Sequence, residues 1–87
     1  MNNKVLIKLI VPEMDAVYDL FIPVNELVWK VKKLIIKAVN DLSSSNIIKN
    51  DNYCLMNKMT GEIYKNNQVI LNTNIRNATE IVLLSSD

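Results

Sequence analysis

Residues 25–42 read NELVWKVKKLIIKAVNDL, and this stretch decides the fold. Its apolar residues recur every three or four positions, which is the spacing that places side chains on one face of a helix. Asn25 is a good N-cap, and Glu26 adds a negative charge to the first turn, where it suits the helix dipole. The sequence therefore predicts a helix to Leu42 whose buried stripe consists of Leu27, Val31, Leu34, Ile35, Ala38 and Leu42, widened by Val28 and Val39.

The segments on both sides of this helix alternate in polarity as half-buried strands do. Residues 4–11 and 17–22 surround a polar break that contains Pro12, so they predict a hairpin before the helix. Residues 52–57, 63–64 and 80–84 predict three further strands, the second of them very short, and Gly61 predicts a turn with positive φ. The helix must pack on the sheet, and the last strand returns most simply beside the first and parallel to it. The predicted fold is α+β, a β-grasp (ubiquitin-like) roll with a mixed sheet of four to five strands and one main amphipathic helix.

Composition bounds the class of protein. The chain has 87 residues, of which 49% are apolar and 22% charged, so we expect a single domain over residues 1–87. Its net charge is only +1, which argues against a protein held to nucleic acid mainly by phosphate contacts. The lone Cys54 favours a reducing compartment, and the apolar run of residues 5–11 is too short for a signal peptide or a membrane span. We therefore expect a cytoplasmic protein without membrane insertion.

Catalytic chemistry has few candidates in this sequence. There is no His, so His-based triads and His-ligated zinc are excluded, and Cys54 has no His to act as its base. The carboxylates are scattered without a spacing that forces two of them together. The chain ends Ser85-Ser86-Asp87 rather than in the flexible Gly-Gly tail that conjugation requires. We expect a non-conjugating protein that is not an enzyme and has no catalytic residue, cofactor or metal.

Several segments resemble a known family. The pattern from Val69 to Leu84, an apolar anchor and a connector with a buried Ile before the final strand, looks like the tail of ubiquitin-like folds. More narrowly, residues 4–84 resemble the YukD-like family of small bacterial ubiquitin-like proteins. The one clear departure is Asn77-Ala78-Thr79-Glu80, where that family often has an Asp-containing Gly turn. The matching segments are Tyr18-Asp19-Leu20, the Val28, Val31 and Leu34 series, and Leu55-Met56-Asn57-Lys58.

The resemblance implies a function through protein contacts. It implies a cytoplasmic accessory or regulatory component of type VII secretion in Gram-positive bacteria, without catalysis, whose partners are components of the secretion machinery. One alternative is a carrier or modifier protein of the same fold, which the tail disfavours. Another is a nucleic-acid-binding factor that uses the helix lysines, which the sequence disfavours because Arg76 is the only Arg.

Two surfaces are candidates for partner binding. On the helix, Trp29 and Ile36 are expected almost opposite the buried stripe, beside Lys32 and Lys33, and this apolar pair rimmed by charge suits a docking site. The plainer alternatives are a solvated lysine face and a Trp29 that folds over the first turn. On the open face of the sheet, an exposed apolar cluster is expected, which a partner or a homo-oligomer would bury. Its members are Leu6, Val82 and Leu84, with Cys54 and Met56 as further candidates.

Overall fold

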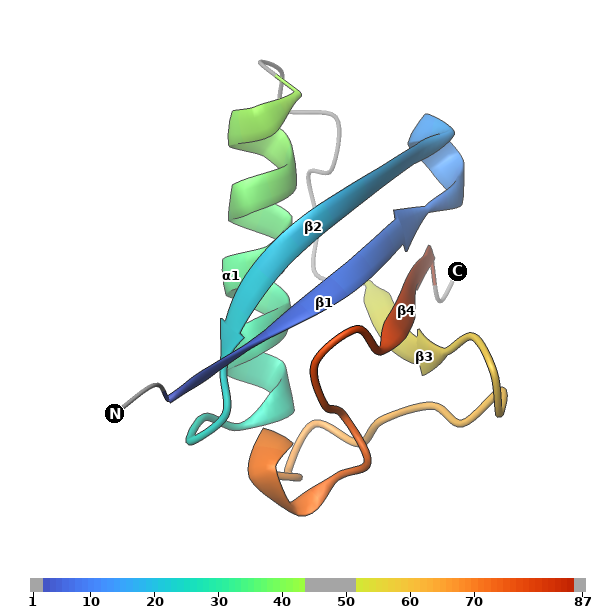
Figure 1. Cartoon of the computed structure of the whole chain (residues 1–87). Helices are drawn as coiled ribbons and strands as arrows, with labels where there is room; N and C mark the ends of the chain where they lie inside the picture. The colour runs from blue at the N-terminus through green and yellow to red at the C-terminus, as the bar shows by residue number, and fades with distance from the viewer. Residues whose placement is uncertain (1–2, 44–51, 86–87) are drawn as a thin grey trace.

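The computed structural model describes residues 3–43 and 52–85, and its elements follow the predicted order. Short 3-10 turns follow the first strand and precede the last. The elements are β1 (Lys4–Val11), the turn Pro12–Met14, β2 (Ala16–Pro23), α1 (Val28–Leu42), β3 (Tyr53–Asn57), the turn Ile70–Asn72 and β4 (Glu80–Ser85). Figure 1 shows the hairpin of β1 and β2, the long helix α1, and the strands β3 and β4 that follow it.

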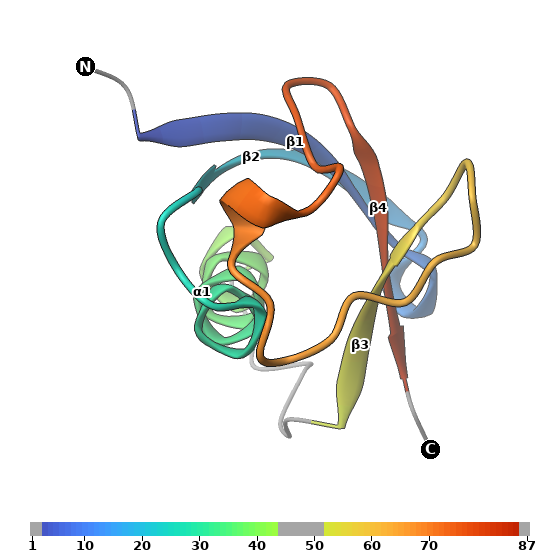
Figure 2. The same cartoon turned by 90° about the horizontal axis from the view of Figure 1, so that it is seen from below.

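The four strands form one mixed sheet in the order β2-β1-β4-β3. β1 pairs antiparallel with β2 and parallel with β4, and β3 pairs antiparallel with β4, so the predicted return of the last strand beside the first is confirmed. The predicted strand at residues 63–64 is wrong, because Ile63 makes only an isolated bridge to Met56. Figure 2 looks nearly along the axis of α1 and shows the strands and the connector before β4 arranged around it.

The core lies between the sheet and one face of α1. Alternate strand residues such as Leu9 and Ile81 are buried there, as period-two patterning requires. The predicted helix stripe is partly wrong, since Leu34 and Leu42 are exposed. The apolar spacing of the helix allows more than one stripe, and the sheet covers only one of them. The covered residues are Val28, Val31, Ile35 and Val39.

The helix also begins later than predicted, at Val28 rather than next to Asn25. Leu27 is extended and makes an isolated antiparallel bridge to Val69, so the chain is not yet helical at this residue. The first helical N–H groups, which need partners at any helix start, donate to backbone carbonyls: Val28 to Gln68 at 2.8 Å and Trp29 to Asn66 at 3.2 Å. The 66–69 segment therefore takes the place of a side-chain cap and lies against Trp29.

A polar network attaches the segment after β3 to the connector before β4. The buried hydroxyl of Tyr64 donates to Asn74 Oδ1 at 2.6 Å and accepts from Asn57 Nδ2 at 2.9 Å. Burial raises the pKa of Tyr64 above its usual 10.0; the hydrogen bond from Asn57 opposes this shift, and the Glu62 carboxylate adds to it. The intervening turn contains Gly61 at φ +76°, which confirms the predicted positive φ.

We predict that Tyr64 makes the folded protein less stable at alkaline pH. Below pH 10 the Tyr64 side chain is neutral in both the folded and the unfolded protein. Above pH 10 it ionises first in the unfolded protein, because its pKa is higher in the folded protein. The free energy of unfolding therefore falls as the pH rises from 10 towards the folded-state pKa. Urea unfolding between about pH 8 and pH 11 measures this loss. Tyr64→Phe should lower stability by about 1–3 kcal/mol at neutral pH, because Asn57 and Asn74 lose a partner. It should also reduce the alkaline loss, and an unchanged alkaline slope would contradict the assignment.

Candidate functional site

A pocket of about 200 Å³ lies beside the first half of α1. Four of its five lining residues are the helix residues selected from the sequence, Trp29, Lys32, Lys33 and Ile36. The fifth is Asn66, from the connector between β3 and β4. The structure therefore brings these residues together in one concave surface, which we call the helix pocket. Asn66 has no sequence signal of its own, since it joins the pocket only through its backbone bond to Trp29.

The apolar part of the helix pocket differs from the expectation. Trp29 is 40% exposed, as predicted, with the ammonium groups of Lys30 and Lys33 at 5.6 and 5.7 Å from its ring centroid. These distances suit cation–π attraction and hold the ring between two positive charges. Ile36 is not opposite the buried stripe, because the stripe is rotated towards it; it is half-buried and packs against the core. Trp29 is thus the exposed anchor, and Ile36 is an inner wall.

The lysines around the pocket have different partners. Lys32 donates from its Nζ to the Tyr53 carbonyl at 3.0 Å and so links α1 to β3. Lys30 pairs with Glu26 at 3.7 Å, and this exposed pair contributes little to stability. Within residues 3–43 and 52–85, no ion pair holds Lys33. The pocket can therefore hold an apolar group against Trp29 while the Lys33 ammonium meets a carboxylate.

The residues expected on the open sheet face do not form one exposed cluster. Val82 lies on that face but is only 7% exposed, because Ile10 and Met56 flank it in register. Leu6 is 37% exposed and Leu84 is half-buried. Since β1 and β4 are in register at Lys8 and Glu80, Leu6 lies before that point and Leu84 beyond it, so the two lie towards opposite ends of the sheet.

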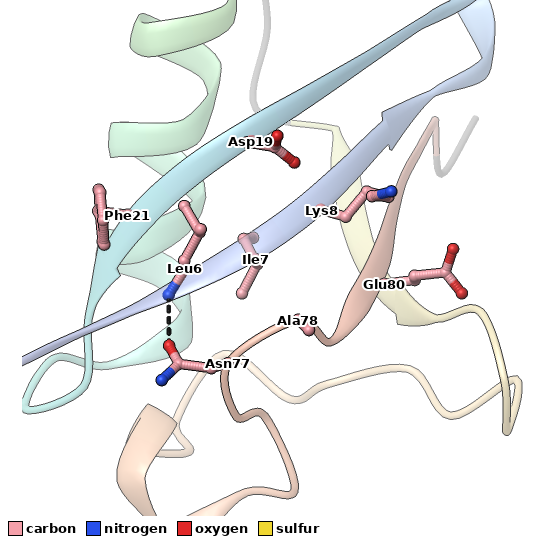
Figure 3. Close-up of a pocket in the computed structure, with 8 residues that line it drawn as sticks. All are labelled: Leu6, Ile7, Lys8, Asp19, Phe21, Asn77, Ala78 and Glu80. Atoms are coloured by element: carbon pink, nitrogen blue, oxygen red, sulfur yellow. Dashed lines mark hydrogen bonds between the residues drawn. The ribbon is translucent and has the colours of Figure 1, made fainter.

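A larger pocket of about 550 Å³ opens on this face, and we call it the sheet pocket. Leu6 contributes to it together with Phe21, its cross-strand neighbour, which is 62% exposed. The sequence could have identified Phe21 as an outward-facing residue, because it alternates with the inward-facing Leu20 and Ile22 along the strand. Figure 3 shows the remaining charged and polar side chains around the opening. The full lining is Leu6, Ile7, Lys8, Asp19, Phe21, Asn77, Ala78 and Glu80.

The turn before β4 closes one side of the sheet pocket. Ala78 donates from its N–H to the Leu6 carbonyl at 2.7 Å, and Leu6 donates from its N–H to Asn77 Oδ1 at 2.9 Å. Ala78 holds φ at +71°, a left-handed conformation that costs a residue with a β-carbon about 1–2 kcal/mol. Ala78 therefore occupies a conformation for which glycine is better suited.

Other chemistry has little support among the described residues. In residues 3–43 and 52–85, no three His, Cys, Asp or Glu side chains gather where a metal ion could bind. The Arg76 guanidinium donates to the Thr73 and Ile75 carbonyls, both at 2.7 Å, so it is engaged in shaping the connector. No helix in the described part of the chain is long and apolar enough to span a membrane.

The comparisons with known proteins establish the fold alone. No known protein family and no curated protein matches the sequence. Among solved structures, the chain is similar to the N-terminal ubiquitin-like domain in the 4931431F19Rik protein, with 16% identity and a TM-score of 0.75 over 100% of this chain and 79% of that one. A chain of the MycP5-free ESX-5 inner membrane complex matches with 12% identity and a TM-score of 0.77 over 97% of this chain and 21% of that one. A chain of the toluene 4 monooxygenase HD complex matches with 8% identity and a TM-score of 0.73 over 94% and 98%. The predicted α+β ubiquitin-like fold is confirmed.

We predict that Ala78→Gly stabilises the protein by about 1 kcal/mol, because the left-handed strain at this position disappears. Thermal and urea unfolding measure the change. Ala38→Gly is the matched control, since the same substitution inside α1 should destabilise by about 0.5–1 kcal/mol. A loss of stability at both positions would show that Ala78 is not strained.

Proposed function

We propose that residues 1–87 form one domain that acts as a non-catalytic protein-interaction module, and that the helix pocket binds an acidic segment of a partner protein. The observation that carries this proposal is that the exposed Trp29 and Lys33 line one pocket, and that Lys33 has no ion pair among the described residues. Trp is enriched among the residues that dominate protein interfaces, because a large ring buried in a complementary pocket contributes strongly to binding.

Charge complementarity selects the chemistry of the partner. Lys30, Lys32 and Lys33 lie around Trp29 and the helix pocket, where Glu26 offsets one of the three charges, whereas the whole chain carries a net charge of only +1. Positive charge is therefore concentrated at this surface, and it attracts an acidic segment over a longer range than direct contact. The ring of Trp29 and the wall of Ile36 add a place for one apolar side chain. We infer a partner segment in which a Leu, Ile or Phe is flanked by Asp or Glu.

The biological setting of the proposal is type VII secretion in the cytoplasm of Gram-positive bacteria, where the domain would be an accessory or regulatory component. The resemblance to the YukD-like family supports this setting. The ubiquitin-like fold within a chain of the ESX-5 inner membrane complex, a type VII secretion complex, adds support at the level of fold. The partner would then be a component of the secretion machinery. The pocket contacts would supply the binding.

Catalysis and nucleic-acid binding are the two functions that compete with this proposal. The toluene 4 monooxygenase chain shows that a similar fold also occurs within an enzyme complex, so the absence of catalysis is part of our proposal. Nucleic-acid binding through the helix lysines is the second rival. It predicts that an oligonucleotide binds in competition with an acidic peptide, with affinity that falls steeply as salt increases.

We predict that a synthetic peptide of Glu alternating with Leu and Phe binds the protein, as measured by isothermal titration calorimetry for the wild type and every variant, and that it shifts the fluorescence of Trp29, the only Trp, in the wild type. Trp29→Ala should weaken binding by about tenfold or more, and loss of the anchor should change the melting temperature by only a few degrees, because the ring is partly exposed.

Two matched controls sharpen this test. Lys33→Glu should weaken peptide binding about as strongly as Trp29→Ala does. Lys37 lies outside the pocket and is paired with Asp41 at 3.3 Å, so Lys37→Glu should weaken peptide binding much less. The proposal would be contradicted if a peptide with Lys in place of every Glu bound equally well, or if an oligonucleotide bound more tightly than the Glu peptide.

A further inference from the structure

The outer face of the sheet carries four charges of alternating sign in one row. Asp19 in β2 is in register with Lys8 in β1, and Lys8 is in register with Glu80 in β4. Lys58, directly after β3, donates its backbone N–H to the Glu80 carbonyl and completes the row. Asp19, Lys8 and Glu80 leave the sheet on the side away from α1, since their strand neighbours face the core. The Lys58 ammonium lies on the same side, 3.9 Å from the Glu80 carboxylate. The sign therefore reads minus, plus, minus, plus from one edge of the sheet to the other.

These charges are little used inside the protein. The Lys58 ammonium lies 3.9 Å from the Glu80 carboxylate, at the outer limit of an ion pair. Within residues 3–43 and 52–85, no ion pair joins Lys8 to Asp19 or to Glu80. Figure 3 shows Lys8, Asp19 and Glu80 spread around the sheet pocket rather than in contact. The row is available to a partner.

Apolar side chains border the charged row on both sides. On one side, Val17, Ile10, Val82 and Met56 follow one another in register across all four strands, and Val17 is 57% exposed. On the other side are Phe21 and Leu6. The face thus combines apolar area with a net charge of zero in the row, so a strongly acidic or strongly basic partner gains no net attraction from the row.

We propose that this face binds a second copy of the same chain, about a two-fold axis that runs parallel to the strands between β1 and β4. That axis reverses the order of the row in the second copy, so Lys8 lies over Glu80 of the second copy and Asp19 lies over Lys58 of the second copy. Every charge then meets its opposite, and each contact occurs twice, as in any isologous dimer. A two-fold axis along the row would instead place each charge over itself. The strands of the two sheets stay nearly aligned, as in ordinary face-to-face packing.

The size of the face limits the area that this dimer can bury. The two longest extents of the molecule are 32 and 27 Å, so one face offers at most an interface of standard size, about 800 Å² per partner. The dimer is therefore reversible and depends on protein concentration. It leaves the helix pocket on α1 free, so this inference does not depend on the function proposed for that pocket.

Sedimentation of the whole chain tests the dimer. We expect the apparent mass of the wild type to rise from the 10.0 kDa of one chain towards twice that value as concentration increases. Lys8→Glu and Glu80→Lys should each raise the dimer dissociation constant by about tenfold or more, because like charges then face each other. An equimolar mixture of the two single variants should dimerise again, since every opposed pair regains opposite signs.

The mixture separates this interface from any other effect of the substitutions. Because Lys8 and Glu80 also neighbour each other within one chain, only a contact between copies allows two weakened variants to rescue one another. Asp19→Lys and Lys58→Asp form a second pair, and a mixture of these two variants should also dimerise again. This second pair replaces the first if circular dichroism shows that Lys8→Glu or Glu80→Lys is unfolded. A wild type that stays monomeric at all concentrations, or folded variants whose mixture shows no rescue, overturns the proposal.

Discussion

The parallel pairing of β1 with β4 is the contact on which the rest of the structure depends. These are the two inner strands of the sheet, and Leu9 and Ile81, which are in register, are both completely buried beneath α1. Because side chains alternate along a strand, the same pairing that places these two residues in the core places Lys8 and Glu80 on the opposite face. One register therefore sets both the core and the charged row.

The connector between β3 and β4 controls the second surface. Carbonyls of Asn66 and Gln68 accept the first hydrogen bonds of α1, which sets the residue at which the helix begins. The bond from the Trp29 N–H to the Asn66 carbonyl also holds Trp29 beside Asn66, at the edge of the stripe that the sheet covers. The helix pocket lies beside α1 and the sheet pocket opens on the outer face of the sheet, so the two partners that we propose would not compete for one surface.

The sequence alone was a good guide where the physics is local. The extents of the first, third and last strands and the turn at Gly61 agree with the structure. Trp29, Lys32, Lys33 and Ile36 also line one pocket, although Ile36 is not on the exposed side expected for it. It failed where a residue depends on distant neighbours. Val82 follows the outward alternation, yet Ile10 and Met56 from two other strands cover it.

Periodicity by itself determined that this chain has one amphipathic helix and strands with two unlike faces, because side-chain direction repeats with the local backbone geometry. Only the tertiary structure decided which of the possible helix stripes is buried, where α1 begins, and that four charges from separate strands stand in one row. Those outcomes depend on register and on contacts between segments far apart in the chain, such as Leu27 with Val69 and Lys8 with Glu80. No local pattern records such contacts.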